Sequence, residues 1–283
     1  MSRLGPWYTV IAVVGATITI SSLIPAVQAK QSAFCRTFSK TFRFKCTEHR
    51  MHSIQGFELV THRLRNREEA DSRASPVLVM HPEFLNGDSW FQFTDAEDRL
   101  LPLLLLNAGF DVWVGHERAT YCPICSSLVA LARTLSRFWN WTWDDHAEDD
   151  VPVFLEYISK ATGSAVHYIG LSQSATVGAA SATMLKNSRF IKSLTLVGPT
   201  IYIGDTNSAV MAAWAFTFGA IIDEANYDNG YQSGVFNTST LSQLRTVNIQ
   251  SVYLDDYAHF DLLWSFRRTR DIFFPVLRFL RRH

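Results

Sequence analysis

Short apolar stretches alternate with longer amphipathic stretches through most of the chain, and this pattern predicts strands and helices in turn. Apolar or β-branched runs bounded by turn residues predict strands at 77–81, 109–115, 166–169, 193–197 and 251–254. Helices are predicted at 97–107 with Asp95 as the cap, and at 144–162, 175–182, 208–222 and 264–280. The helix at 144–162 begins with a cluster of acidic residues, which suits the positive end of a helix dipole. This order of elements is typical of an α/β fold, a mostly parallel central sheet flanked by helices.

Composition and charge narrow the function classes. The chain has 283 residues, of which 47% are hydrophobic and 18% charged, as expected for one globular domain with a short leader. Its 26 basic residues balance its 26 acidic residues, and no glycine-rich phosphate loop is present, so nucleic acid is not an expected partner. His49, His52 and His62 lie close in sequence but lack an acidic or cysteine partner that would fix a coordination geometry, so neither a metal nor a cofactor is expected.

The first residues have the features of a secretory leader. Arg3 precedes an apolar run at 8–24 and a small-residue site that ends at Ala29. This order predicts a signal peptide at 1–29, cleaved after Ala29, and a single domain at 30–283. The alternative interpretation is an uncleaved membrane anchor, because the apolar run is long for a signal peptide. Glycosylation sequons at Asn140 and Asn237 are compatible with a secreted, vacuolar or lysosomal glycoprotein.

Four cysteines would then fold in an oxidising compartment. Cys35 and Cys46 flank a short segment and can form a disulfide near the start of the mature chain. Cys122 and Cys125 have redox-motif spacing but no thioredoxin-like strand and helix around them. They are therefore interpreted as a local disulfide or as two separate thiols.

One sharp turn links the strand at 166–169 to the small-residue helix that follows it. Its sequence, Gly170-Leu171-Ser172-Gln173-Ser174, matches the nucleophile elbow G-x-S-x-G except at the last glycine. Such a turn lifts Ser172 Oγ out of the strand and lets the backbone N–H of Gln173 face an oxyanion. The alternative interpretation is an ordinary turn, because G-x-S triplets are common by chance.

A histidine lies in the loop between the last predicted strand and the last predicted helix. This residue is His259, and the loop runs from Asp255 to Asp261. A general base that serves an elbow serine follows it in the chain at such a position. The alternative is a surface histidine, one of nine in the chain. Its place in the predicted topology favours the catalytic interpretation.

Several segments together resemble the acid and neutral lipases, which include gastric and lysosomal lipases and plant triacylglycerol lipases. The resemblance extends over most of the mature chain and rests on segments 45–49, 77–81, 108–115, 138–144, 170–173 and 253–261. It implies an α/β-hydrolase fold and a carboxylic ester hydrolase that acts on lipid esters, triacylglycerols or sterol esters, at a membrane or lipid-droplet surface. It further implies that Ser172 forms the acyl-enzyme, that His259 takes its proton, and that the amides of Gln173 and Glu83 bind the oxyanion.

The chain departs from this family at positions where the chemistry is demanding. In the loop after the strand at 77–81, Pro82 replaces the glycine of the family's His-Gly turn and Glu83 replaces the apolar residue that follows it. In the elbow, Leu171 replaces a histidine and Ser174 replaces the last glycine. Ala119 replaces the glycine of the family's Arg-Gly-Thr. Proline has no N–H and fixes φ, so another path is expected for the oxyanion loop. A glutamate carboxylate beside an oxyanion opposes it unless the side chain turns away. Ser174 is expected to cost space where helix and strand pack closely.

The triad acid is not identifiable from the sequence. The interval between Pro199 and Ser251 is too short for the family's lid together with its aspartate strand, which predicts a reduced lid. The candidates are Asp205, Asp223 and Asp228, whereas Asp255 and Asp256 lie too near His259 along the chain. Two hypotheses therefore remain. The chain is either a working serine lipase or esterase, or a lipase-like protein, such as a truncated product, that has lost the acid and its catalysis.

Overall fold

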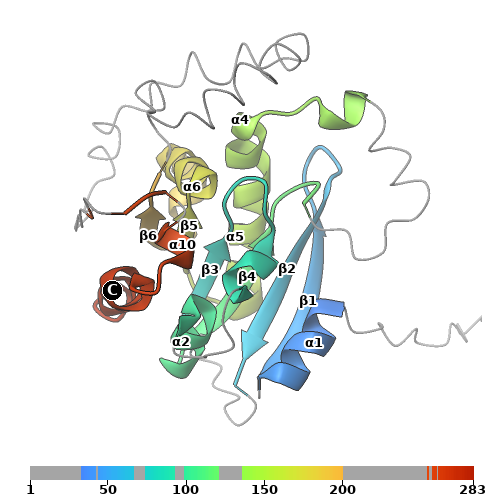
Figure 1. The fold of residues 1–283 in the computed structure, drawn as a ribbon. Helices are drawn as coiled ribbons and strands as arrows, with labels where there is room; N and C mark the ends of the chain where they lie inside the picture. Colours follow the sequence, from blue (N-terminus) through green and yellow to red (C-terminus); the bar gives the residue numbers. More distant parts are fainter. Residues whose placement is uncertain are drawn as a thin grey trace, which may run out of the picture. The chain divides into compact units, whose positions relative to one another are not determined.

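A computed structural model describes residues 33–42, 44–66, 74–92, 99–120, 136–199, 254, 257–259 and 261–283 (Figure 1). Several features predicted from the sequence lie outside these residues. They are the signal peptide at 1–29, Asp95, the pair Cys122 and Cys125, Asn237, the helix at 208–222, the strand at 251–254 apart from Leu254, and the reduced lid. Among the described helices, none has the length and apolar character needed to cross a membrane.

A six-stranded mixed sheet forms the centre of the described part of the chain (Figure 1). Its strands lie in the order β1-β2-β4-β3-β5-β6. They are β1 Lys45–His52, β2 Glu58–Arg65, β3 Pro76–Met80, β4 Asp111–His116, β5 Val166–Leu171 and β6 Ile191–Val197. The pairs β4–β3, β3–β5 and β5–β6 are parallel, whereas β2 pairs antiparallel with both β1 and β4. The mostly parallel sheet and four of its predicted strands are thus confirmed.

Helices connect these strands. They are α1 Ala33–Thr41, α2 Leu101–Asn107, α4 Trp143–Asp145, α5 Val151–Thr162, α6 Gln173–Thr183, α7 Leu185–Ser188, α10 Asp261–Trp264 and α11 Phe274–Leu280. A π-helical turn, η4 His146–Asp150, joins α4 to α5, so the predicted helix at 144–162 is confirmed as one continuous helical segment. Short 3-10 helices cover Gly87–Phe91 and Ser136–Trp139.

Two helices differ from the prediction, one in its start and one in its continuity. The helix expected at 97–107 begins at Leu101, with Leu100 as its N-cap, because Pro102 favours the first turn of a helix and fits poorly further inside one. The closing helix expected at 264–280 is interrupted. Trp264 ends α10, and after a turn a second π-helical segment, η6 Thr269–Phe273, leads into α11.

The strands β3, β4 and β5 are buried on both faces of the sheet, as their apolar runs require. Side chains alternate along a strand, so Val77 and Val79 of β3 join one hydrophobic cluster while Leu78 and Met80 join the other. The first cluster includes residues of α1, α2 and α11, and the second includes residues of α5 and α6. This double cover holds the carboxyl ends of the parallel strands in fixed positions, and loops from these ends carry the candidate site.

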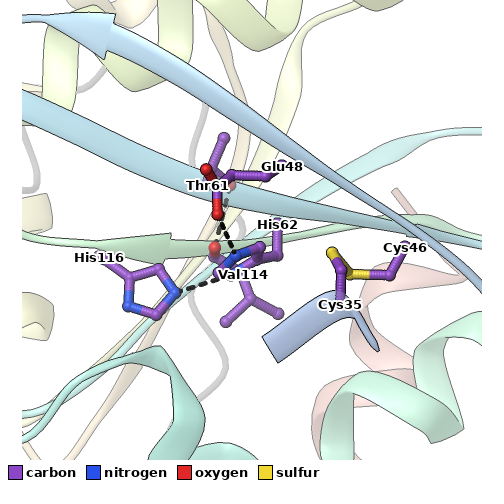
Figure 2. Close-up of a disulfide and its surroundings, with 7 residues drawn as sticks. All are labelled: Cys35, Cys46, Glu48, Thr61, His62, Val114 and His116. Atoms are coloured by element: carbon purple, nitrogen blue, oxygen red, sulfur yellow. Dashed lines mark hydrogen bonds and ion pairs between the residues drawn. A yellow bond between two sulfur atoms is a disulfide. The ribbon is translucent and has the colours of Figure 1, made fainter. Parts of the chain in front are cut away.

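A disulfide between Cys35 and Cys46 ties α1 to β1, as predicted (Figure 2). Cys35 is fully buried and packs with Phe38 in the first hydrophobic cluster. The bond closes a short loop and removes conformational freedom from the unfolded chain.

Candidate active site

The elbow at the end of β5 has the backbone expected for a nucleophilic serine. Ser172 lies between β5 and α6 with φ 61° and ψ −123°, a strained conformation for a residue other than glycine. Its side chain is largely buried, with 8% of the residue exposed. Gly170 makes the turn possible, because a Cβ atom added there would lie 2.5 Å from the carbonyl oxygen of Ser174. The sharp turn therefore depends on a glycine two residues before the serine.

Ser174, which replaces the last elbow glycine, is buried and hydrogen-bonded. Its Oγ accepts the N–H of Leu171 at 2.9 Å and lies 3.1 Å from the carbonyl oxygen of Met80 and 3.0 Å from that of Leu171. The hydroxyl thus links the elbow to the end of β3. The steric cost expected for this serine is not what the structure shows, because its hydroxyl is hydrogen-bonded and supports the turn.

His259 faces the elbow serine. Its Nε2 lies 2.7 Å from Ser172 Oγ, so the structure brings together the two residues put forward as base and nucleophile. Gly198, at the end of β6, lies beside the imidazole: a Cβ atom placed on it would be 3.6 Å from both Nδ1 and Cε1 of His259. Desolvation lowers the pKa of His259 below its ordinary 6.5, which favours the neutral ring that can accept a proton.

The loop after β3 begins at His81 and carries Glu83. His81, at the start of this loop, donates from Nδ1 to the carbonyl oxygen of Pro82 at 2.8 Å, and its Nε2 accepts the N–H of Glu117 at 3.2 Å. The loop turns at Phe84, which has φ 64° and is 71% exposed. Pro82 stands where the family has glycine, and the left-handed backbone of this loop is instead found two residues later, at Phe84.

The environment of the Glu83 side chain raises its pKa. Burial, and secondarily the negative charge of Glu117, raises the pKa of Glu83 above its ordinary 4.5. His146 and the side chain of Gln173 act in the opposite direction and lower the pKa of Glu83, but less strongly.

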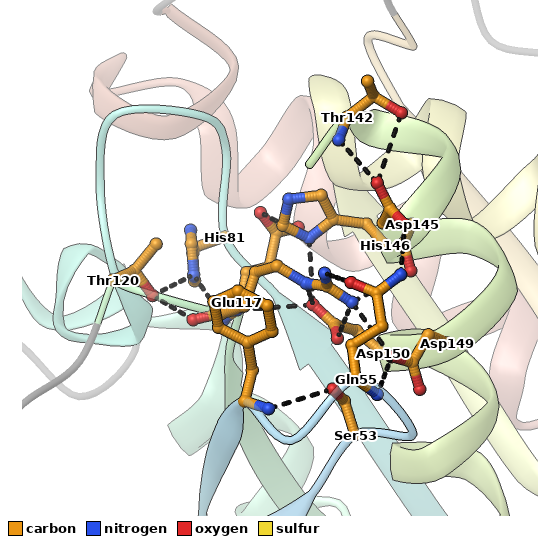
Figure 3. A network of polar contacts seen from close by, with 12 residues as sticks. Ser53, Gln55, His81, Glu117, Thr120, Thr142, Asp145, His146, Asp149 and Asp150 are labelled. Atoms are coloured by element: carbon orange, nitrogen blue, oxygen red, sulfur yellow. Dashed lines mark hydrogen bonds and ion pairs between the residues drawn. The ribbon is translucent and has the colours of Figure 1, made fainter. Parts of the chain in front are cut away.

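A buried ion-pair network lies behind this loop (Figure 3). Arg118 is fully buried and donates to Asp150 from Nε at 2.9 Å and from Nη2 at 2.8 Å, and to Gln55 Oε1 at 2.8 Å. Asp149 accepts from Arg118 and from the backbone N–H of Ile54. Asp149 and Asp150 thus neutralise one arginine, which the sequence pattern did not indicate. Asp144 and Asp145 lie in the first turn of α4, as expected for residues that suit a helix dipole.

The start of α4 and the loop residue Ala119 are also fixed by local structure. Asp145 accepts the backbone N–H of Thr142 at 2.7 Å and closes a capping box at the start of α4. Ala119, which stands where the family has glycine, has φ 62° and so keeps a backbone that favours glycine. The neighbouring Arg118, just after β4, is bonded to Asp150 and so ties η4 to the end of β4.

Two buried histidines form a second polar chain between the strands (Figure 2). The N–H of Gly87 donates to His116 Nδ1 at 3.2 Å, so His116 Nε2 carries the proton and donates to His62 Nδ1 at 2.9 Å. His62 Nε2 then donates to Glu48 at 3.3 Å, and this bond is the largest cause that lowers the pKa of Glu48 to about 2. The described residues contain no cluster of three or more metal-ligating side chains.

The candidates for the triad acid, Asp205, Asp223 and Asp228, lie outside the described residues, as do Asp255 and Asp256. Asp261, which is described, accepts the backbone N–H of Ala258 at 2.8 Å and holds the turn that carries His259. The sequence signal for this bond is an aspartate placed three residues after the backbone N–H that it accepts, here Asp261 and Ala258.

A parallel sheet that delivers a strained serine between β5 and α6, with a histidine from a later loop opposite it, defines the α/β-hydrolase fold. The predicted fold class is therefore confirmed. No protein-family model matches the chain.

Curated relatives of this chain are lipases. Triacylglycerol lipase 2 of Arabidopsis thaliana is 29% identical over 199 residues, which cover 69% of this chain and 47% of the relative. The lysosomal acid lipase/cholesteryl ester hydrolase of Homo sapiens is 27% identical over 139 residues, which cover 48% of this chain and 34% of the relative. The chain spans about half the length, or less, of the curated relatives it matches. These relatives confirm the resemblance to the acid lipases of α/β-hydrolase fold.

Solved structures similar to this chain include an esterase of Pyrococcus furiosus, with a TM-score of 0.43 and 14% identity over 66% of each chain. Brefeldin A esterase, a bacterial homologue of human hormone-sensitive lipase, has a TM-score of 0.41 and 16% identity, covering 60% of this chain and 44% of that one.

Proposed function

We propose that this protein is a carboxylic ester hydrolase that acts on lipid esters through a serine acyl-enzyme. The observation that carries the proposal is the 2.7 Å contact between His259 Nε2 and the Oγ of Ser172 on its strained elbow. A neutral imidazole at hydrogen-bond distance from a hydroxyl is the pairing that activates a serine nucleophile.

The reaction follows from this geometry. Ser172 Oγ attacks the ester carbonyl carbon while its proton passes to His259 Nε2. The backbone N–H groups of Gln173 and Glu83 bind the oxyanion of the tetrahedral intermediate. The C–O bond to the alcohol then breaks, and the alcohol leaves with the proton from His259. Water, deprotonated by His259, attacks the acyl-enzyme, and the fatty acid and free Ser172 are released. Asp205, Asp223 and Asp228 are the candidates for the carboxylate that orients His259.

The substrate class is proposed from the relatives and from the surface near the site. The names of the relatives specify triacylglycerols and cholesteryl esters, and such esters require contact with a lipid surface. Phe84, 71% exposed in the loop beside Glu83, provides an apolar side chain for that contact. The predicted leader and the disulfide between Cys35 and Cys46 favour the secretory pathway, with a lysosomal, vacuolar or extracellular destination.

A second candidate function is a lipase-like protein that binds lipid esters without turnover. It is favoured by Glu83, whose own backbone amide is a proposed oxyanion donor, because an ionised carboxylate close to that amide opposes a developing oxyanion.

Hydrolysis of short-chain and long-chain p-nitrophenyl esters separates the two candidates. The full chain is compared with Ser172→Ala, His259→Gln and the surface control Ser188→Ala. A hydrolase loses at least about 10³-fold in kcat with either site substitution and nothing with the control. A fluorophosphonate reagent should label the full chain and not Ser172→Ala. Equal rates and equal labelling in the full chain and Ser172→Ala would refute the proposal.

A further inference from the structure

A pocket lies where α10 ends and η6 begins, outside the candidate active site. Its volume is about 270 Å³. The lining combines two arginines with aromatic and hydroxyl side chains: Arg99, Trp264, Ser265, Phe266, Arg268 and Thr269. None of these six residues belongs to the elbow, to the loop after β3 or to the turn that carries His259. A cavity of about 150 Å³ can admit benzene, so this pocket has room for a polar head group and several methylene groups.

Arg268 is a buried cation in the wall of this pocket. Only 6% of the residue is exposed. Its guanidinium donates from Nε at 3.4 Å and from Nη2 at 3.3 Å to the carbonyl oxygen of Arg99, and its Cζ lies 5.9 Å from the centre of the Phe273 ring. The two bonds use two of the five N–H groups of a guanidinium. The remaining end, formed by Nη1 and the second N–H of Nη2, has no acceptor among the described residues.

No carboxylate of the described residues neutralises Arg268. The segment 261–283 has six arginines and two aspartates. Asp261 accepts a backbone N–H of its own turn, and Asp271 is bonded to a tyrosine hydroxyl at 2.9 Å and to a neighbouring arginine. Arg99, the second arginine of the lining, is exposed and adds a further positive charge. Because buried charges in proteins are nearly always paired, this arrangement favours a bound anion.

The aromatic part of the lining fits a hydrocarbon chain. Trp264 is partly buried and packs against the first hydrophobic cluster, whereas Phe266 is 88% exposed. An exposed aromatic ring beside a partly apolar pocket offers contact to a chain that extends out of it. An inorganic anion would make no use of either aromatic side chain. An anion that carries an apolar chain therefore matches the pocket better.

We propose that this pocket binds a long-chain fatty acid through its carboxylate. The two carboxylate oxygens accept from the free end of the Arg268 guanidinium, and the chain lies against Trp264 and Phe266. A planar guanidinium suits this head group, because its two parallel N–H groups match the two oxygens. The inference does not depend on the proposed function, since no lining residue takes part in the proposed reaction.

Isothermal titration calorimetry of the full chain with dodecanoate, below its micelle concentration, measures the binding. We expect Arg268→Met to weaken the affinity at least about tenfold, because it removes the guanidinium and keeps an apolar side chain. Phe266→Ser should weaken it about threefold or more, since it removes apolar contact with the chain. Arg282→Met, at an exposed arginine of the same segment, is the matched control and should bind like the unmodified chain.

Other probes identify the chemistry that the pocket recognises. Acetate has the head group alone and should bind at least about tenfold more weakly than dodecanoate. Dodecyltrimethylammonium has the chain with a positive charge and should show no binding that depends on Arg268. Dodecyl phosphate should bind no more tightly than dodecanoate, because the free end of one guanidinium serves two oxygens.

Equal affinity of dodecanoate for the unmodified chain and Arg268→Met would place the binding elsewhere and overturn the proposal. Tighter binding of dodecyl phosphate, or binding of the cationic amphiphile that depends on Arg268, would overturn the carboxylate as the recognised group. If Arg268→Met fails to fold, Arg268→Lys replaces it, and it should still weaken binding because it lacks the planar pair of donors. Dodecanoate should bind Ser172→Ala as it binds the unmodified chain, so a failure of the proposed function is distinguishable from a failure of this site.

Discussion

Replacing Ser174 with glycine restores the usual elbow pattern, and we expect it to destabilise the protein. Ser174 is fully buried, and its Oγ accepts the N–H of Leu171 at 2.9 Å and contacts two carbonyl oxygens at 3.0 and 3.1 Å. In Ser174→Ala the Leu171 N–H loses this acceptor in a buried position, which costs about 1–3 kcal/mol. Ser174→Gly adds the backbone entropy of a helical glycine, about 1 kcal/mol more.

Urea unfolding of the unmodified chain, Ser174→Ala, Ser174→Gly and the exposed control Ser188→Ala measures these differences. The control should stay within about 0.5 kcal/mol of the unmodified chain. The order of stability should be unmodified, then alanine, then glycine. A glycine variant as stable as the unmodified chain would refute the reasoning, because the hydroxyl would then contribute nothing to the turn.

Three further substitutions test the supports of the sheet and the elbow. Because the pKa of Glu48 is lowered to about 2, its bond to His62 stabilises the fold above about pH 4.5 and is lost as the pH falls through about 2. Glu48→Gln should therefore lower the free energy of unfolding by about 1–3 kcal/mol in urea at neutral pH and by far less near pH 2, and an equal loss at both would contradict this. Gly170→Ala should cost about 3 kcal/mol in urea unfolding, since its Cβ would strike backbone atoms of the following helix, and a neutral result would show that the elbow can shift. Arg118→Met should cost about 3–5 kcal/mol in urea unfolding, and adding Asp150→Asn should recover part of that loss; no recovery would argue against the pair.

The parallel part of the sheet could be predicted because its strands are continuous apolar runs. All five residues of β3 and all six of β5 are buried, so the sequence needs no alternation to reveal them. The hairpin of β1 and β2 carries a different signal. In β1 only Cys46 and Met51 are buried, and charged residues occupy both faces, so no period-two pattern marks the strand.

The polar networks could not be read from the sequence for a related reason. Arg118 and Asp150 are 32 residues apart, and His62 and His116 are 54 apart. A charged or aromatic polar residue near an apolar strand gives no local sign that its partner lies on another element. By contrast, Ser172 and His259 were found because their positions relative to strand ends follow from the topology.

Three replacements of family glycines, Pro82, Ala119 and Ser174, do not by themselves decide between a working and a silent enzyme. Ala119 keeps φ 62°, at a cost of about 1–2 kcal/mol, and is held between the buried Arg118 and the hydroxyl of Thr120, which donates to the carbonyl oxygen of Glu117. Ser174 supports the elbow through its hydroxyl, and the loop after Pro82 turns at Phe84 instead. The contact between Ser172 and His259 exists alongside all three replacements. What separates the two functions is therefore electrostatic: whether a carboxylate orients His259, and which charge Glu83 carries.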